Sequence, residues 1–254
     1  MSGMLLEQRF MKINIKLVGL FVLVYLVALV ATTPLSWVKQ YIDPVLQAQG
    51  VRLVELQGNL WRGSGQVQVP QQPPYKVEWQ SRPVELFLAR LPYQLSVSTP
   101  FVDVNGRVLL KPLGLAIEDF SGHVDEGQYS RILSNFNAGI QGRLVFEDVS
   151  AASSWRLALG DASGQLSWSG GPLSLRFGSS NQRFEVPQMA GMILSDDEAW
   201  RLNIAGLNGE SYIESRLERE GMGVVEVRRV LADQMNLSIP GSSPILVELA
   251  QKVF

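Results

Sequence analysis

Apolar residues recur at every second position along most of this chain, and that period constrains the fold more than any other feature. Beyond Gly50, leucines, valines and aromatic residues alternate with polar ones in short runs. Such alternation is typical of strands with one side toward a core, whereas a helix needs a period of about 3.6. The alternating residues are Val67, Val69, Tyr75, Val77, Trp79, Leu91, Tyr93, Leu95, Val97, Leu157, Leu159, Leu166, Trp168, Leu173, Leu175, Phe177, Leu202, Ile204, Val225, Val227, Leu237 and Ile239. They predict a mainly β fold with a curved, mostly antiparallel sheet.

Several glycines mark turns between these strands. Gly58, Gly142 and Gly164 each precede a polar residue and a leucine, and we expect each to begin an outgoing strand. Gly63-Ser64-Gly65 lacks the third glycine of a dinucleotide site and any Gly-Lys-Ser/Thr sequence, so a hairpin turn is the preferred interpretation. The spacings differ too much for a regular repeat array.

A few short helices are expected to interrupt the sheet. Residues 36–50 favour a helix interrupted at Pro44 and ended by Gly50. Tyr129, Ile132, Leu133 and Phe136 follow helical spacing after two acidic residues. Ser243-Pro244 has the form of a helix start before the apolar residues up to Val253, and this last helix has two open roles, closing the sheet or binding a partner.

The N-terminal part of the chain contains a candidate membrane span. Leu17 to Val38 are 22 consecutive uncharged residues, enough to cross a hydrocarbon core of about 30 Å as a helix. Basic residues are concentrated before this stretch, so the N-terminus is predicted to be cytoplasmic. The expected domains are a cytoplasmic 1–16, a transmembrane helix 17–35, a juxtamembrane helix 36–50 and a periplasmic β domain 51–254.

Three alternatives to this organisation stay open. A signal peptide cleaved after Ala31 would release the β domain, although Leu29-Val30-Ala31 is a poor cleavage site. Met11 opens a more usual basic leader than Met1, so either can be the true start. The β domain can also divide into two similar lobes near 121–150.

Composition excludes several functions. The chain has 22 basic and 24 acidic residues with no run of like charge, which argues against nucleic-acid binding. It has no cysteine and one histidine, which exclude disulfides, thiolate metal sites and two-histidine metal motifs.

The remaining candidates for chemistry are weak. Asp196, Asp197 and Glu198 lack the spacing of a calcium loop and favour a solvated turn. His123, expected in a loop between Asp119 and Asp125, has no nucleophile or metal partner in its motif. We therefore predict no catalytic, cofactor-binding or metal-binding residue, and a protein that is not an enzyme.

Five tryptophans fall in the predicted β domain, and most follow the strand period. Core packing is the simpler role for them; the alternative is an apolar groove on an uncovered sheet that binds acyl chains or another polypeptide. They are Trp61, Trp79, Trp155, Trp168 and Trp200.

One segment after the predicted span carries a family resemblance. It reads Leu56-Gln57-Gly58-Asn59-Leu60-Trp61-Arg62-Gly63-Ser64-Gly65. With the basic N-terminus, the single span and the outward β domain, it resembles protein N of the bacterial type II secretion system, a family with a Leu-x-Gly-Thr-Leu-Trp-x-Gly signature. Asn59 stands where threonine is common, and either residue suits a turn.

The resemblance implies a signature hairpin made of Leu56, Gly58, Leu60, Trp61 and Gly63. Its glycines would permit a tight backbone while Trp61 fixes the hairpin to the core. The resemblance also implies a single-pass inner-membrane subunit that assists export of folded periplasmic proteins and contacts other secretion subunits and membrane lipid. A lipid-binding or envelope-scaffold protein with an apolar β groove is the alternative function.

Overall fold

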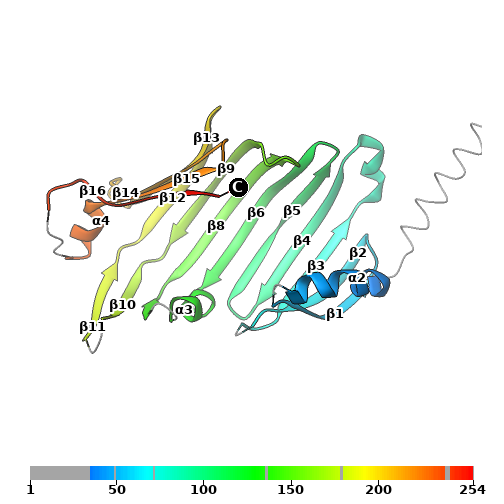
Figure 1. Ribbon diagram of the computed structural model, residues 1–254, viewed down its shortest axis with the longest axis horizontal. Helices are drawn as coiled ribbons and strands as arrows, with labels where there is room; N and C mark the ends of the chain where they lie inside the picture. Colours follow the sequence, from blue (N-terminus) through cyan, green and yellow to red (C-terminus); the bar gives the residue numbers. More distant parts are fainter. Residues whose placement is uncertain are drawn as a thin grey trace, which may run out of the picture.

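The fold is a long antiparallel sheet with a small second sheet and short helices. The structure is a computed structural model that describes residues 35–48, 50–70, 72–134, 137–177, 180–237 and 241–253 (Figure 1). The larger sheet has 13 strands in the order β1-β2-β3-β4-β5-β6-β8-β9-β12-β13-β14-β15-β16. These neighbours all pair antiparallel, which confirms the predicted mostly antiparallel β fold.

The strands of the larger sheet follow the chain as a meander. Their bounds are β1 Arg52–Gly58, β2 Arg62–Gln68, β3 Tyr75–Ser81, β4 Leu91–Thr99, β5 Val102–Lys111, β6 Gly114–Asp125, β8 Arg143–Ser154, β9 Leu159–Trp168, β12 Met189–Ser195, β13 Ala199–Gly206, β14 Ser211–Glu218, β15 Met222–Arg228 and β16 Ile245–Lys252. A 3-10 helix, η1 (Pro83–Leu88), connects β3 to β4.

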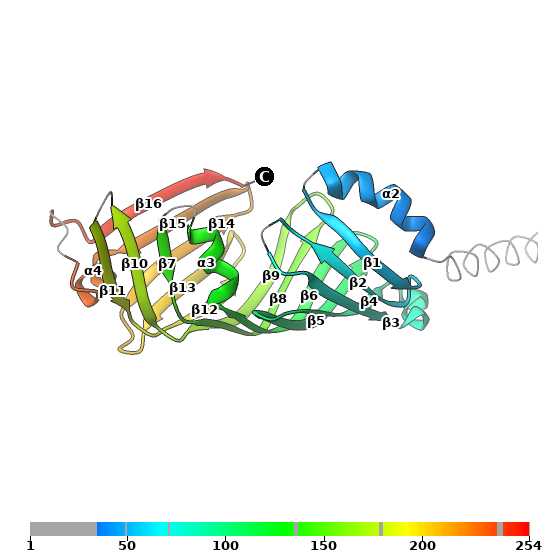
Figure 2. The same cartoon turned by 90° about the horizontal axis from the view of Figure 1, so that it is seen from below.

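The smaller sheet interrupts the meander twice. Its strands lie in the order β11 (Ser180–Val186), β10 (Gly171–Phe177) and β7 (Ala138–Ile140). Helix α3 (Glu126–Ser134) precedes β7, where the sequence predicted a helix; Phe136, the last residue of that prediction, lies outside the described residues. Figure 2 shows the larger sheet curving so that its first and last strands rise on opposite sides, with α3 inside the curve.

The strand register divides the larger sheet into an apolar face and a polar face, because residues directly opposite each other point to the same side. The apolar face includes Val67, Val77, Trp79, Leu95, Val97, Val108, Ile117, Phe146, Leu166, Ile193, Leu202, Ile204, Ile213, Val225 and Val227. The opposite face is mostly polar and is called the polar face; Val145, Met192 and Leu194 are apolar exceptions on β8 and β12. Its polar residues include Ser64, Glu78, Gln80, Gln94, Ser96, Asn105, Arg107, Gln165, Asn203, Glu214 and Glu226.

The apolar face is only partly covered. Tyr129 of α3 packs on Trp168 of this face, with ring centroids 5.5 Å apart, so α3 covers it near β9. Among the described residues, no large side chain has less than 2% of its surface exposed. Most apolar-face side chains are half-buried. The core is therefore a thin apolar layer on a curved sheet.

The predicted helix within 36–50 is present as α2 (Leu35–Ala48). Gly50 follows it with a φ of 76°, and its N–H donates to the carbonyl oxygen of Gln47 at 3.0 Å. The expected interruption at Pro44 is wrong, because the helix continues through it. One proline removes a single backbone hydrogen bond, which bends a helix without necessarily ending it.

The predicted C-terminal helix is wrong: residues 245–252 form strand β16, paired with β15. Ile245, Val247 and Leu249 also follow a period of two, and β15 offers them a row of backbone partners. Ser243 accepts the N–H of Ile245 at 3.3 Å, so the residue expected to begin a helix precedes a strand instead.

Three further expectations about turns and strands are corrected. Gly63, Ser64 and Gly65 lie inside β2 and not in a hairpin turn. Gly142 does precede β8, whereas Gly58 ends β1 and Gly164 lies within β9. Leu157 is in a turn with a φ of 61°, and Leu237 follows helix α4 (Arg229–Gln234); Ile239 lies outside the described residues.

The predicted transmembrane helix 17–35 also lies outside the described residues, except for Leu35. Within the described part of the chain, no helix is long and apolar enough to span a bilayer. The larger sheet runs without interruption from β6 to β8 and β9 across region 121–150, and the division into two lobes there stays a prediction.

Candidate functional site

The signature segment forms the hairpin of β1 and β2 at one end of the larger sheet. Its turn is closed by Asn59, whose Oδ1 accepts the backbone N–H groups of Trp61 and Arg62, both at 2.9 Å. The N–H of Asn59 donates to the carbonyl oxygen of Arg62, also at 2.9 Å. Asparagine therefore suits this position because its side chain supplies the acceptor for two turn N–H groups.

Gly58 and Gly63 stand opposite each other where the two strands meet the turn. Gly58 has a φ of 96°, in the left-handed region that glycine adopts without a Cβ penalty. A Cβ on either residue would lie less than 3.0 Å from backbone atoms of the opposite strand. The hairpin therefore requires glycine at both signature positions.

Gly63 also makes room for Trp79 of β3, its direct neighbour on the apolar face. A Cβ at Gly63 would lie 2.9 Å from Cε2 of the Trp79 ring and closer still to Cζ2. The indole Nε1 donates to the carbonyl oxygen of Asn59 at 3.2 Å. Trp79 therefore lies across the hairpin and connects its turn to the third strand.

The other signature residues lie in β1 and in the turn. Leu56 lies in β1 opposite Gly65, while Leu60 and Trp61 lie between the strands, and all three are half-buried. The carbonyl oxygen of Trp61 accepts the N–H of Ser81 at 2.6 Å. The expectation that the Trp61 side chain fixes the hairpin to the core stays a prediction.

On the polar face, the hairpin borders a shallow hollow of about 530 Å³ that extends across the first five strands. Uncharged hydrogen-bonding side chains dominate its lining, with one arginine and one glutamate. The polar lining residues include Gln57, Arg62, Ser64, Glu78, Gln80, Gln94, Ser96 and Asn105. Such a surface suits hydrogen bonding to another molecule and has no group arranged for proton transfer.

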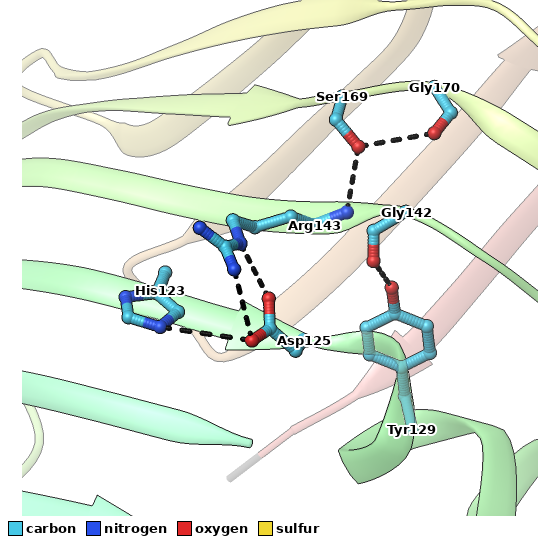
Figure 3. A network of polar contacts seen from close by, with 7 residues as sticks. All are labelled: His123, Asp125, Tyr129, Gly142, Arg143, Ser169 and Gly170. Carbon is cyan, nitrogen blue, oxygen red and sulfur yellow. Dashed lines mark hydrogen bonds and ion pairs between the residues drawn. The ribbon is translucent and has the colours of Figure 1, made fainter. Parts of the chain in front are cut away.

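His123 lies in β6 and not in the predicted loop (Figure 3). Its Nε2 is 3.9 Å from Asp125 Oδ2, and Asp125 also accepts a 2.5 Å bond from Nε of Arg143 in the paired strand β8. Arg143 and His123 therefore approach the same carboxylate. The Asp125–Arg143 ion pair connects the end of β6 to the start of β8. It has the geometry of a structural ion pair.

Tyr129 belongs to the same region of Figure 3 and supports α3. Its hydroxyl donates to the carbonyl oxygen of Gly142. Burial, followed by the negative charges of Glu126 and Asp125, raises the pKa of Tyr129 to about 12. A phenol with this pKa stays protonated near neutral pH, so it acts as a hydrogen-bond donor and not as a base.

The acidic cluster forms the turn between β12 and β13, as predicted. Asp196 Oδ1 accepts the N–H groups of Glu198 and Ala199 at 2.9 Å, and its Oδ2 pairs with Arg201 at 2.6 Å. The two backbone hydrogen bonds, followed by that of Arg201, lower the pKa of Asp196. Among the described residues, no group of His, Cys, Asp or Glu side chains could hold a metal ion.

The sequence pattern missed one contact of the signature hairpin and misplaced one tryptophan outside it. The strand period predicts only a core position for Trp79. In the structure its ring packs against Gly63, and its indole N–H donates to the carbonyl oxygen of Asn59 in the turn. The spacing of Gly63 and Gly65 could have indicated this contact. It places two residues without side chains on one face of β2, next to Trp79 and Val77 of β3. Trp155 was expected in the core, but it is 56% exposed after β8.

The fold and this hairpin define a class: proteins built on one long, curved antiparallel meander with an apolar face. The chain belongs to the family of protein N of the type II secretion system (T2SS), because the family model matches residues 49–218, more than half of the chain. The match includes the whole signature and ends with β14. Neither the search of curated proteins nor the search of solved structures found a match.

Membership identifies the chain as a component of the type II secretion system associated with the cell envelope. Proteins N are secretion components and not generally enzymes. The family also implies interaction with other subunits of that system.

Proposed function

We propose that this protein is a non-catalytic inner-membrane subunit of the type II secretion system that assists export of folded periplasmic proteins across the outer membrane. The observation that carries the proposal is the family match over residues 49–218, which contains the complete signature hairpin. The fold is consistent with this role, because a long curved sheet offers extended surfaces to other subunits.

The topology within this proposal comes from the sequence. Residues 17–35 anchor the chain as a single span, residues 1–16 are cytoplasmic, and the domain 51–254 is periplasmic. A periplasm-dependent reporter fused after residue 254 should be active, and N-terminal sequencing should find an intact start. An inactive reporter, or a chain cleaved near Ala31, would contradict the anchor.

The direct test of the proposed role is co-purification from the native host after mild detergent extraction. The tagged full chain should retain other inner-membrane secretion subunits. The variant Gly63→Val should retain fewer, because its side chain cannot fit beside Trp79, whereas Gly65→Ala should behave as the wild type. Recovery of the folded full chain without any secretion subunit would refute the proposal.

The alternative function is lipid binding, and one observation favours it as a second candidate. The apolar face extends across the larger sheet, and its side chains are mostly half-buried, so it offers apolar surface to acyl chains. Native mass spectrometry of the full chain from detergent distinguishes the two candidates. Phospholipid retained at fixed stoichiometry would support lipid binding, and a lipid-free chain would exclude it.

A further inference from the structure

The larger sheet ends in a long strand with an open edge. β16 pairs with β15 on one side, and within the described part of the chain no strand pairs with its other side. Figure 2 shows β16 along the rim of the sheet. Six of its eight residues are exposed, and Leu249, on the apolar face, is 63% exposed. At the opposite end, by contrast, β1 has helix α2 beside it (Figure 2).

This edge has the features of a pairing site. An open strand presents unpaired N–H and C=O groups, and proteins usually protect such edges with proline, bulges, a short strand or a covering element. β16 contains no proline and has eight residues. Only two of these residues are charged, Glu248 and Lys252. Its register with β15 shifts once, near Ile245, and is regular from Val247 to Lys252. This regular part offers a mostly apolar template for another strand.

The direction of the backbone groups fixes which residues can pair. The N–H of Val253 donates to the carbonyl oxygen of Gly221, toward β15. Because backbone groups alternate along a strand, the N–H and C=O of Glu248, Ala250 and Lys252 point to the open side. An added strand must form its hydrogen bonds with these three residues.

The charges on the edge make it complementary to itself. If a second β16 pairs antiparallel with Ala250 opposite Ala250, Glu248 of each copy lies opposite Lys252 of the other, and Val247 lies opposite Val253. A register with Glu248 opposite Glu248 would place two carboxylates together. A register with Leu249 opposite Leu249 would leave Glu248 and Lys252 without an oppositely charged partner. Opposite charges across paired strands are favourable and like charges are unfavourable.

We propose that two copies of this chain pair antiparallel through their β16 edges, with Ala250 opposite Ala250. The pairing forms about six backbone hydrogen bonds and extends the apolar face continuously from one copy into the other. The β16 strand lies beyond the family match at residues 49–218, and the inference is independent of the proposed secretion role.

Cysteine cross-linking of the purified full chain in mild detergent tests the register. The chain has no cysteine, so each introduced thiol is the only one. Directly opposite residues across a hydrogen-bonded pair have Cα atoms about 5.5 Å apart, within reach of a disulfide. Ala250→Cys should therefore form a covalent dimer on mild oxidation. Leu249→Cys, about 7–8 Å from its equivalent, and the exposed control Val54→Cys should form little.

Charge reversal tests the same register without oxidation. Light scattering should give a protein mass of twice 28.1 kDa for the wild type. Glu248→Lys or Lys252→Glu alone should weaken dimerisation by about tenfold, because two like-charge pairs replace two opposite pairs. The double variant Glu248→Lys, Lys252→Glu should restore it, which a folding defect would not do.

Any of three results would overturn the proposal. They are a monomeric wild type at micromolar concentration, cross-linking of Leu249→Cys in preference to Ala250→Cys, or a double charge variant no better than the single ones. A purified complex in which a different polypeptide occupies the β16 edge would overturn it as well.

Discussion

Replacing Gly63 with alanine tests the contact at the centre of the signature hairpin. The added Cβ would lie less than 3.0 Å from the Trp79 ring and from the carbonyl oxygen of Gln57. The carbonyl belongs to a paired backbone and cannot move without breaking the hairpin, and the indole is held by its bond to the Asn59 carbonyl oxygen. Gly63→Ala should therefore destabilise the protein.

The expected loss of stability in Gly63→Ala follows from overpacking of the site. Forcing one methyl group into a packed site costs about 1–3 kcal/mol. In a chain of this length each kcal/mol lowers the melting temperature by about 2–4 °C, so a cost of about 2 kcal/mol corresponds to roughly 4–8 °C. Circular dichroism of the full chain in detergent measures this shift.

Gly65→Ala is the matched control, two residues away on the same face of β2. Its Cβ would lie 3.2 Å from the backbone carbonyl oxygen of Glu55 and 3.3 Å from Cδ1 of Leu56, and shifts of a few tenths of an ångström in β1 and in the leucine side chain relieve both contacts. Loss of chain entropy in the unfolded state would offset part of that cost, so its melting temperature should change little.

A double-mutant cycle separates the ring contact from general strain. With Trp79→Leu in place, Gly63→Ala should cost less than it does in the wild type, because the indole is gone. Equal melting temperatures for Gly63→Ala and Gly65→Ala, or strictly additive effects with Trp79→Leu, would refute this account of the signature.

Three further predictions concern the turn, the polar face and the histidine. Asn59→Ala should cost about 1–2 kcal/mol in chemical denaturation through loss of two turn hydrogen bonds, and Asn59→Thr should retain part of that stability; equal costs would contradict the proposed acceptor role. The hydrogen bond from Arg228, followed by that from Ser211, lowers the pKa of Glu214 in the folded state, so its stabilisation is present above the ordinary value near 4.5 and is lost as the pH falls through the folded pKa. The melting temperature of wild type minus that of Glu214→Gln should therefore shrink below about pH 4.5, and a pH-independent difference would contradict this. His123→Ala should leave secretion of exported enzymes unchanged, and a loss of secretion with normal protein levels would show that the residue has a function.

The sequence predicted the fold class well because its signal is strong and local. In β3, β4 and β10, apolar residues alternate with polar or proline residues because successive side chains point to opposite faces of a strand. This alternation can be read from the sequence alone. Helix α3 was also identified from its spacing. These elements obey one period over most of their length.

Elements whose local signals conflict were predicted less well. Residues 245–252 carry both a helix-start sequence and strand-like alternation, and the open edge of β15 decides between them. A prediction from neighbouring residues cannot include that edge, because β15 and residues 245–252 come together only when the chain folds. Similarly, Gly63 resembles a turn residue in sequence, whereas it leaves space for the Trp79 ring of β3.

The resemblance predicts a hairpin at the signature, and β1 and β2 form one there, but the contacts within it do not follow from the sequence. Asn59 and Gly58 follow from turn chemistry. The role of Trp79 depends on a strand pairing across sixteen residues, Gly63 with Trp79, that no motif in the sequence encodes. Contacts of this kind require the register of the sheet.

The central claim is that this chain works in type II secretion, and secretion itself is its most direct test. The measurement is the fraction of a type II-dependent enzyme released to the medium by a strain lacking this chain, with and without the wild-type chain restored. We expect the enzyme to accumulate in the periplasm of the deletion strain and to return to the medium when the chain is restored. Normal release from the deletion strain would contradict the claim.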